Sequence, residues 1–293
     1  TSHAAMVARG LGLPGIVGAS SIHYNRKKKT ITAPDGREFG EGDVITIDGT
    51  SGTVLAGEMP MLEPGLDDAF QTLMGWADAY RDIKVRANAD TLEEAQIAMT
   101  FAAEGIGLTR TEHMFFEEDR LTVMREMIFA ETPEGRAAAL ERLVPMQIAD
   151  FTALFKLMDG KPVCIRLFDP PLHEFLPHSA EGMRELADAL GLSVSKVTRR
   201  VDAMAEFNPM LGLRGVRLGV TMPEIYEAQA RAIFMASLHA AANGYPVTPE
   251  IMIPLVSARR QVELIQRRVE AVPGELRAKS GKHFDYRLGV LVE

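Results

Sequence analysis

A regular alternation of short apolar runs and long amphipathic stretches begins at Ile83, and it limits the fold more than any other feature of this sequence. Such alternation is typical of βαβ units, in which a helix carries the chain from one strand to a parallel neighbour. The six predicted strands are 83–86, 106–109, 163–167, 216–218, 251–256 and 288–292. The main predicted helices are 134–158, 181–206, 223–243 and 257–271. An α/β protein with a parallel sheet is therefore expected.

Polar side chains stand where several predicted strands end. The clearest of them are Arg86, Arg110, Arg166 and Glu293. A (β/α)8 barrel binds its ligands at the carboxyl ends of its strands, because the βα loops converge there. A doubly wound open sheet also binds ligands at this edge, so alternation alone does not separate the two folds. With either fold, these polar side chains predict an anion site at the strand ends.

Arg110 and Arg166 end two different predicted strands. Arginine presents a planar fork of donors that matches phosphate and carboxylate oxygens, so two converging arginines suit a phosphorylated carboxylic acid. The alternative is that the two arginines form structural ion pairs with Glu112 and Asp169. The residues alone do not decide between a substrate site and structural pairs.

The first 81 residues follow a different pattern. Residues 1–57 contain short β-rich runs separated by glycine and aspartate, which predicts hairpins in a small domain. Residues 58–66 hold two prolines and a glycine, which predicts a linker, and a helix is expected at 67–81. The predicted organisation is a small domain at 1–57, a linker and linker helix at 58–81, and the α/β domain at 82–293.

Charge and cysteine content narrow the functional classes. A formal net charge of -8 is unlike that of a nucleic-acid-binding chain. Cys164 is the only cysteine, so no internal disulfide can form, and a reducing, cytoplasmic compartment is expected. Cys164 falls in an apolar strand and is predicted to be a small buried hydrophobe. No apolar run reaches the roughly 18 residues of a membrane helix, so neither nucleic acid nor a membrane is an expected partner.

His3 and Glu293 are weaker candidates for chemistry. His3 lies at the start of a predicted helix, where free amides and the helix dipole favour a phosphoryl group on a nucleophilic imidazole. From its position alone, His3 is predicted to be an exposed residue without a catalytic role. Glu293 could bind Mg²⁺, which prefers a few carboxylates with substrate oxygens and water, although one carboxylate is poor evidence.

Several segments of the chain resemble the phosphoenolpyruvate (PEP)-utilising enzymes. Residues 1–10, Thr-Ser-His-Ala-Ala-Met-Val-Ala-Arg-Gly, resemble the phosphohistidine segment of that family. The segments that match the dikinase branch of the family best are 85–90, 107–115, 165–171 and 208–215. Because these separate motifs occur in the same order as in the family, the resemblance covers essentially the whole chain.

The resemblance implies a TIM-type (β/α)8 barrel that binds PEP and pyruvate, preceded by part of a small β-rich swivelling phosphohistidine domain. The implied reaction converts ATP, phosphate and pyruvate to AMP, pyrophosphate and PEP through a phosphorylated His3. Arg110 and Arg166 would hold the substrate with support from Arg214, while Glu293 would bind substrate and Mg²⁺. The implied partners are an ATP-grasp domain of the same polypeptide, a second copy in a homodimer, and a regulatory kinase or phosphorylase acting at Thr1.

The sequence also departs from the family pattern. The Gly-Gly pair that usually precedes the histidine motif is missing, and Gly289-Val290-Leu291-Val292-Glu293 stands where Gly-Thr-Met-Ile-Glu is common. The barrel is expected to be truncated after the sixth strand, so that strands seven and eight and their catalytic residues are absent. The chain alone is therefore expected to be inactive. The alternatives are a PEP synthase, which uses water in place of phosphate, and a non-catalytic phosphocarrier or substrate-binding module.

Overall fold

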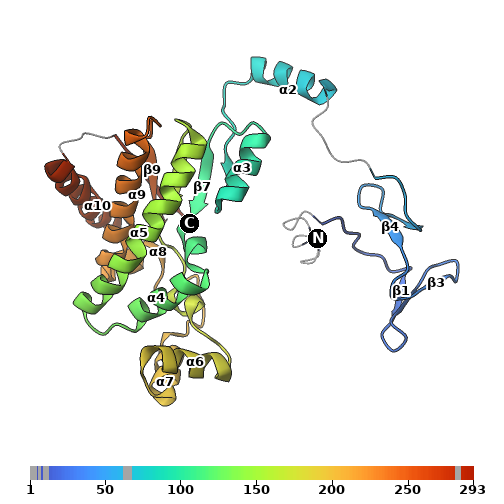
Figure 1. Cartoon of the computed structure of the whole chain (residues 1–293), viewed down its shortest axis with the longest axis horizontal. Coiled ribbons are helices and arrows are strands. Elements are labelled where there is room, and N and C mark those ends of the chain that lie inside the picture. The colour runs from blue at the N-terminus through green and yellow to red at the C-terminus, as the bar shows by residue number, and fades with distance from the viewer. Residues whose placement is uncertain (1–4, 6–7, 9–12, 62–67, 281–284) are drawn as a thin grey trace. The chain divides into compact units, whose positions relative to one another are not determined.

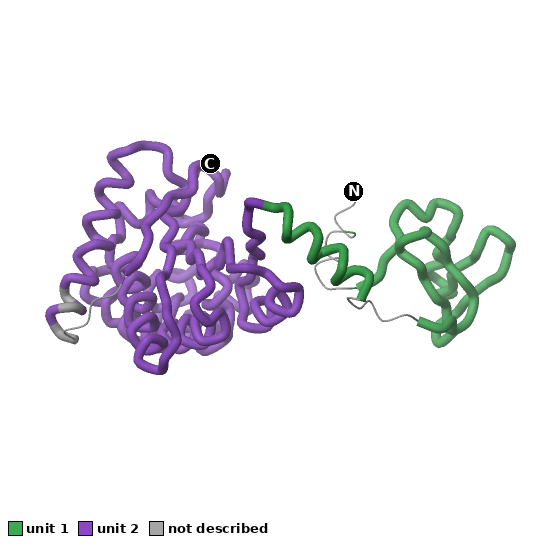
Figure 2. Tube along the Cα trace, turned by 90° about the horizontal axis from the view of Figure 1, so that it is seen from above, with its two compact units in different colours: residues 1–81 green, residues 82–293 purple. Residues whose placement is uncertain are grey.

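The computed structural model describes residues 5, 8, 13–61, 68–280 and 285–293. The chain divides into two compact units, Thr1–Arg81 and Asp82–Glu293, which are coloured separately in Figure 2. Thr1 and His3 lie outside the described residues, as does most of the helix predicted near the N-terminus. No helix within the described ranges combines the length and hydropathy that crossing a bilayer requires.

The first unit contains the predicted hairpins. Its elements are β1 (His23–Asn25), β2 (Thr30–Thr32), β3 (Glu38–Phe39), β4 (Ile45–Asp48), β5 (Thr53–Ala56) and α2 (Asp68–Tyr80). β1, β2 and β3 form an antiparallel sheet, and β4 pairs with β5. Asp48 closes the second hairpin, because its carboxylate accepts hydrogen bonds from the Thr50 N–H and the Ser51 hydroxyl.

The second unit is built on one parallel sheet. Its strands are β6 (Ala87–Asn88), β7 (Ile106–Arg110), β8 (Val163–Arg166), β9 (Pro249–Val256) and β10 (Arg287–Val292). Their order across the sheet, β10-β9-β8-β7-β6, follows their order in the chain. A doubly wound sheet reverses its strand order at a switch point. The described strands show no such reversal, and their monotonic order is consistent with a barrel wall.

Helices separate consecutive strands, as the alternation predicts. The helices are α3 (Leu92–Thr100), α4 (Glu118–Phe129), α5 (Pro133–Met158), α6 (Ala180–Leu190), α7 (Val194–Met204), α8 (Gly215–Thr221), α9 (Pro223–Ala242) and α10 (Arg259–Ser280), with 3₁₀ turns η1 (Thr111–Phe115) and η2 (Leu172–Phe175). Figure 1 shows α5, α9 and α10 along one side of the sheet and α6 and α7 together at one end of the unit. Thr132 caps α5, since its hydroxyl accepts the Gly135 N–H, and Pro133 opens the helix.

Three predicted elements need correction. The strand predicted at 216–218 is wrong, because these residues lie within α8, and β10 is consequently the fifth strand of the sheet. The strand predicted at 83–86 lies a few residues later, as β6. The helix predicted at 181–206 is two helices, because Gly191 takes a left-handed conformation (φ 63°) and the Ser193 hydroxyl caps α7.

The helix α8, which contains residues 216–218, packs closely against α9. A Cβ built at Gly219 would lie 2.5 Å from Cε2 of Tyr226, whose side chain is fully buried. The absence of a side chain at Gly219 therefore allows α8 to approach α9. An apolar run of three residues is too short to show either a helical or a strand period, so the sequence pattern does not reveal this contact.

Gly219→Ala is expected to destabilise the protein by about 1–3 kcal/mol, because the new methyl group would overpack the contact with Tyr226. Gly274 in α10 is the matched control, since no atom lies within 4 Å of a Cβ built there. Gly274→Ala should instead stabilise by about 0.5–1 kcal/mol, the usual gain for alanine in a helix. Urea denaturation of both variants measures the difference, and equal effects would refute the packing explanation.

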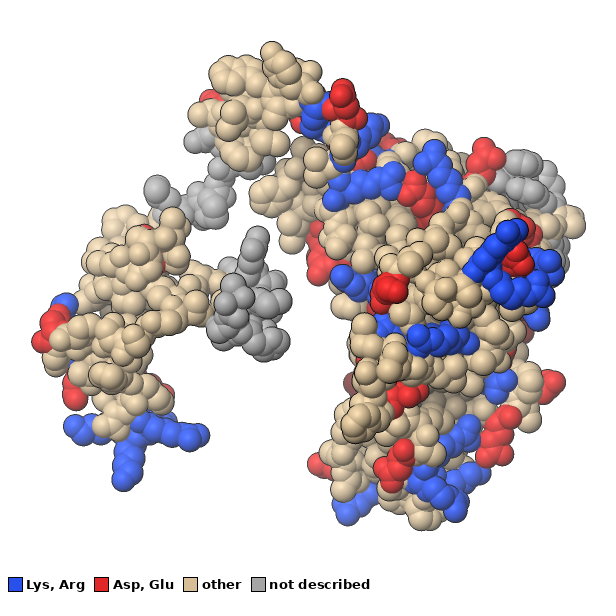
Figure 3. Space-filling model, turned by 180° about the vertical axis from the view of Figure 1, so that it is seen from behind, with Lys and Arg blue, Asp and Glu red and all other residues tan. Residues whose placement is uncertain are grey.

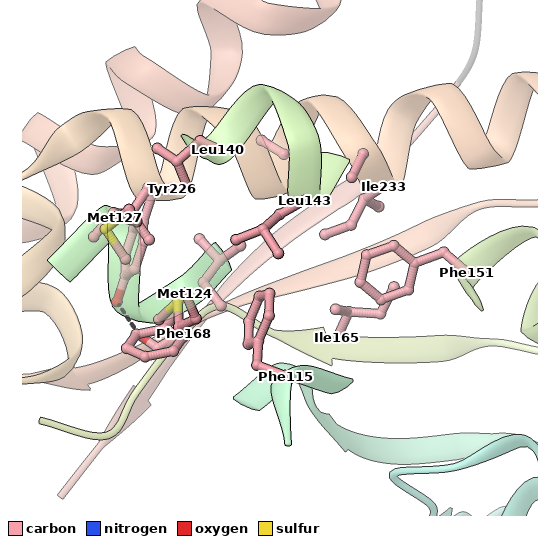
Figure 4. Packing of buried hydrophobic residues seen from close by; sticks show 14 of the residues in the cluster. Phe115, Met124, Met127, Leu140, Leu143, Phe151, Ile165, Phe168, Tyr226 and Ile233 are labelled. Carbon is pink, nitrogen blue, oxygen red and sulfur yellow. Dashed lines mark hydrogen bonds between the residues drawn. The ribbon is translucent and has the colours of Figure 1, made fainter. Parts of the chain in front are cut away.

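The core lies between the sheet and helices α4, α5 and α9. Figure 4 shows Phe151 of α5 beside Ile165 of β8, and Met124 of α4 beside Phe168. Phe115, Phe168 and Phe175 form a cluster of ring contacts at the carboxyl end of the strands, with centroid separations of 5.4–6.5 Å. All three rings belong to the segments that follow β7 and β8 in the chain.

Candidate functional site

The two predicted strand-end arginines are neighbours in the sheet. Arg110 at the end of β7 is in register with Arg166 at the end of β8. Asp90, which is buried two residues after β6, holds Arg110 from the adjacent strand. Its Oδ1 accepts the Arg110 backbone N–H at 2.7 Å, and its Oδ2 accepts the Arg110 Nη1 at 2.9 Å. Arg110 remains 36% exposed, so its guanidinium is still accessible to a ligand.

Arg166 is held by two carboxylates. Its Nη2 donates to Glu112 Oε1, and its Nη1 lies 3.0 Å from Asp169 Oδ2. All three side chains are nearly buried. The predicted structural pairs are thus present for Arg166. The partner of Arg110 is Asp90, a carboxylate that the open alternative of structural ion pairs did not include.

Arg214 binds the same carboxylate as Arg166, that of Asp169. The residues that we call the strand-end cluster are Asp90, Arg110, Glu112, Arg166, Asp169 and Arg214. It precedes α8, and its Nη2 donates to Asp169 Oδ2 at 2.6 Å. The following residue, Gly215, donates its N–H to the Asp169 carbonyl at 2.9 Å and has φ of 54°. A Cβ at Gly215 would lie 2.7 Å from the Leu255 Cβ and 2.9 Å from Asp169 Oδ1, so both its φ and its surroundings favour glycine. Asp169 therefore binds Arg166 and Arg214 together.

Several buried polar atoms of this cluster have no hydrogen-bond partner among the described residues. They are Glu112 Oε2, Arg166 Nε, Asp169 Oδ1 and Arg214 Nε. Buried polar groups in proteins are almost always hydrogen-bonded, and unsatisfied ones call for water, an ion or a functional explanation. The cluster is thus fixed by ion pairs without using its full hydrogen-bonding capacity.

Two side chains of α9 fix the turn between Arg166 and Asp169. Gln229 Oε1 accepts the Phe168 N–H at 2.8 Å, and Gln229 Nε2 donates to the Thr111 hydroxyl at 2.9 Å. Tyr226 donates its hydroxyl to the Phe168 carbonyl at 2.9 Å, the bond dashed in Figure 4. Burial raises the pKa of Tyr226 well above its usual value, and the nearby charge of Asp169 adds to this rise, so the hydroxyl remains a donor.

Three residues of the site were not predicted from the sequence: Asp90, Tyr226 and Gln229. Tyr226 and Gln229 are three residues apart and so share one face of α9, where their neighbours Ile225, Ala230 and Ile233 are apolar and buried. Polar side chains on a buried helix face are the signal that could have found the first two. Asp90 belongs to the segment 85–90 that resembles the family, but the residues around it in the sequence do not reveal that it binds Arg110.

Glu293 and Cys164 are not part of this cluster. Glu293 follows β10 and is exposed. Burial raises the pKa of the Cys164 thiol to about 11, so this residue is a buried hydrophobe and not an acid or base near neutral pH. No group of three or more His, Cys, Asp and Glu side chains within the described ranges could hold a metal ion.

The surface charges are mixed. The face drawn in Figure 3 shows basic and acidic side chains interspersed, without one large field of a single sign.

Two family models match this chain. The model described as PEP-utilising enzyme, PEP-binding domain matches residues 66–293, and the model described as PEP-utilising enzyme, mobile domain matches residues 1–52. The chain belongs to the PEP-utilising enzymes. The family resemblance seen in the sequence motifs is confirmed, and the arginine cluster lies within the match to the PEP-binding domain.

Curated relatives of this PEP-utilising enzyme carry the name pyruvate, phosphate dikinase. Its sequence is 52% identical to the protein from Rhizobium meliloti (strain 1021), 46% to that from Giardia intestinalis and 43% to that from Clostridium symbiosum. Each alignment covers 100% of this chain but only 33–34% of the relative. The chain thus spans about a third of the length of the curated relatives it matches.

Proposed function

We propose that this chain is the phosphohistidine and PEP/pyruvate-binding portion of a pyruvate, phosphate dikinase. The reaction would interconvert ATP, phosphate and pyruvate with AMP, pyrophosphate and PEP, and His3 would carry the phosphoryl group. The relatives named dikinase, aligned over the whole chain, support this reaction over that of a PEP synthase. An ATP-grasp domain of the same polypeptide would supply the phosphoryl group to His3.

The observation that carries the proposal is the arginine cluster at the strand ends. Arg110 and Arg166 are in register, and Arg166 shares Asp169 with Arg214. Guanidinium groups that are already oriented suit the carboxylate and phosphoryl oxygens of PEP, and they would stabilise charge on the transferring group. The accessible guanidinium of Arg110 would contact PEP directly, while Arg166 and Arg214 would complete the site.

The remaining assignments belong to the same proposal. Residues 1–57 would form part of the swivelling domain, residues 58–81 the linker, and residues 82–293 the wall of a TIM-type (β/α)8 barrel. Because the sheet has five strands, a closed eight-stranded barrel would need three more strands, not the two expected from the sequence. Glu293 would contribute one carboxylate to substrate and Mg²⁺.

Regulation and assembly are also proposed by analogy with the family. Thr1 lies two residues before His3, and a phosphate on Thr1 would repel a phosphoryl group approaching the histidine. A cytoplasmic homodimer is the proposed form.

The proposal predicts that the whole protein gains one phosphoryl group when it is incubated with PEP and Mg²⁺. Intact mass spectrometry should show an acid-labile gain in the parent and in His23→Ala, and no gain in His3→Ala. His23 is the matched control because it is an exposed histidine of the same unit. A folded parent that gains no mass would refute the relay.

A further inference from the structure

A cavity lies beside the segment that leads to Arg214. Its volume is about 470 Å³, within the range of roughly 300–1,000 Å³ that is usual for small-molecule sites. It is lined from five directions: the α4–α5 junction, η2, α7, residues 205–213 and the α8–α9 junction. Leu213 belongs to its wall, whereas Arg110, Arg166 and Asp169 do not. The cavity is therefore separate from the strand-end cluster.

The walls of this cavity combine apolar surface with two arginines. The apolar side chains include Ile128, Leu172, Met204 and Met222. Arg136 and Arg200 contribute the guanidinium groups, whose exposed fractions are 15% and 24%. Such a lining suits a molecule with one apolar part and one anionic group.

Arg136 has unused donors. Its Nε donates to Glu224 Oε1 at 2.5 Å, and this ion pair fixes the plane of the guanidinium. Neither terminal nitrogen of Arg136 has a hydrogen-bond partner among the described residues. A carboxylate in the cavity could accept both terminal donors in the bidentate geometry that arginine favours.

The hydrogen bonds of the Arg200 guanidinium are long. Its Nη2 lies 3.4 Å from the Ile128 carbonyl and 3.5 Å from the Ala130 carbonyl, and its Nη1 lies 3.5 Å from Glu131. These distances exceed the usual 2.7–3.2 Å of N–H···O bonds. Glu131 is 65% exposed and lies closer to Lys196, at 3.1 Å. A stronger acceptor in the cavity would therefore improve the hydrogen bonding of Arg200.

The other ionisable groups of the wall are Glu131, Glu206 and His173. Glu206 uses Oε1 to accept the Leu213 N–H at 2.9 Å, so part of its capacity is taken by the backbone. The His173 ring lines the cavity, and its Nδ1 is buried without a hydrogen-bond partner within the described ranges. The preference for an anion therefore rests on the terminal nitrogens of Arg136, which have no hydrogen-bond partner among the described residues, and on the long hydrogen bonds of Arg200.

We propose that this cavity is a second ligand site, which binds a small amphipathic carboxylate through Arg136 and Arg200 and holds its apolar part against Ile128, Leu172 and Met222. The site does not depend on the proposed dikinase reaction, because neither arginine belongs to the strand-end cluster.

The probe for this test is 4-fluorobenzoate, which carries a carboxylate on an apolar ring. ¹⁹F NMR titration of the whole protein should show saturable binding with a Kd near 1 mM, as expected for about ten non-hydrogen atoms. Arg136→Met and Arg200→Met should each weaken binding about tenfold or more. Ala203→Phe should weaken it equally, because Ala203 lines the cavity and a larger side chain there would fill it without breaking an ion pair.

Arg110→Met distinguishes the two sites. The cavity proposal requires unchanged probe binding in Arg110→Met, whereas binding at the strand ends would be lost. It is overturned if Arg110→Met alone abolishes binding, if Ala203→Phe binds like the parent, or if the parent shows no saturable binding by about 10 mM. Thermal melts establish that each variant is folded, and Ala203→Phe alone decides if the arginine variants are not. PEP binding is measured separately, so loss of the dikinase proposal would leave this result intact.

Discussion

Asp169→Ala is expected to lower the free energy of unfolding by about 3–5 kcal/mol, the cost of removing one partner from a buried ion pair. Asp169 is 1% exposed, and its Oδ2 lies 3.0 Å from Arg166 Nη1 and 2.6 Å from Arg214 Nη2. Arg166 would keep Glu112 as a partner, whereas Arg214 would lose its only carboxylate among the described residues. Most of the cost should therefore come from Arg214.

Urea denaturation of the parent and the variant measures this cost. Glu263→Ala is the control, because Glu263 also pairs with two arginines, Arg259 and Arg260, but is a third exposed. It should change stability by no more than about 1 kcal/mol. The double variant Asp169→Ala/Arg214→Met should recover part of the loss, since it no longer buries an unpaired cation. Equal effects of the two single carboxylate replacements would contradict the bridging role of Asp169.

Helix boundaries could be predicted where side chains define them locally. The spacing of Thr91 and Glu94 predicts a capping box, and the Thr91 hydroxyl indeed accepts the Glu94 N–H at 3.1 Å. Glu94 does not complete the box, because its carboxylate accepts the N–H of Asp90 instead, at 2.7 Å. This hydrogen bond connects the first turn of α3 to Asp90, the residue that binds Arg110.

Elements that depend on distant contacts could not be predicted in this way. Residues 216–218 belong to a helix that packs against α9 through Gly219 and Tyr226, and the local pattern does not contain this contact. The barrel-like order of the strands was likewise open, because alternation is shared by barrels and doubly wound sheets. Only the observed pairing of strands separates the two arrangements.

The candidate site also contains some residues that could be predicted from the sequence and others that could not. Arg110 and Arg166 could be found from the sequence because both end apolar strands, and parallel strands bring their carboxyl ends to one edge. Arg214 follows no strand and was assigned from the family resemblance alone. The pairing of Arg110 with Asp90 and the double role of Asp169 arise from tertiary packing, so sequence spacing did not reveal them.

Arg110→Met is expected to weaken PEP binding by about 10- to 100-fold, the range for loss of a hydrogen bond to a charged group. Arg110 is the most exposed arginine of the cluster, so its replacement should affect the ligand more than the fold. Arg110→Lys should give an intermediate loss, since lysine keeps the charge but lacks the planar fork. Isothermal titration calorimetry with PEP and Mg²⁺ measures the three affinities.

Arg287→Met provides the matched control at the opposite end of the same sheet. Arg287 begins β10, is 73% exposed and pairs with Glu250 at 3.2 Å, far along the strands from the cluster. Its replacement removes the same charge from the protein, so a general electrostatic effect on an anionic ligand would weaken binding in both variants. A loss confined to Arg110→Met would locate PEP at the carboxyl ends of the strands. Equal affinities in Arg110→Met and the parent would instead mean that the exposed guanidinium does not contact PEP, and that the ion pairs of the cluster serve the fold alone.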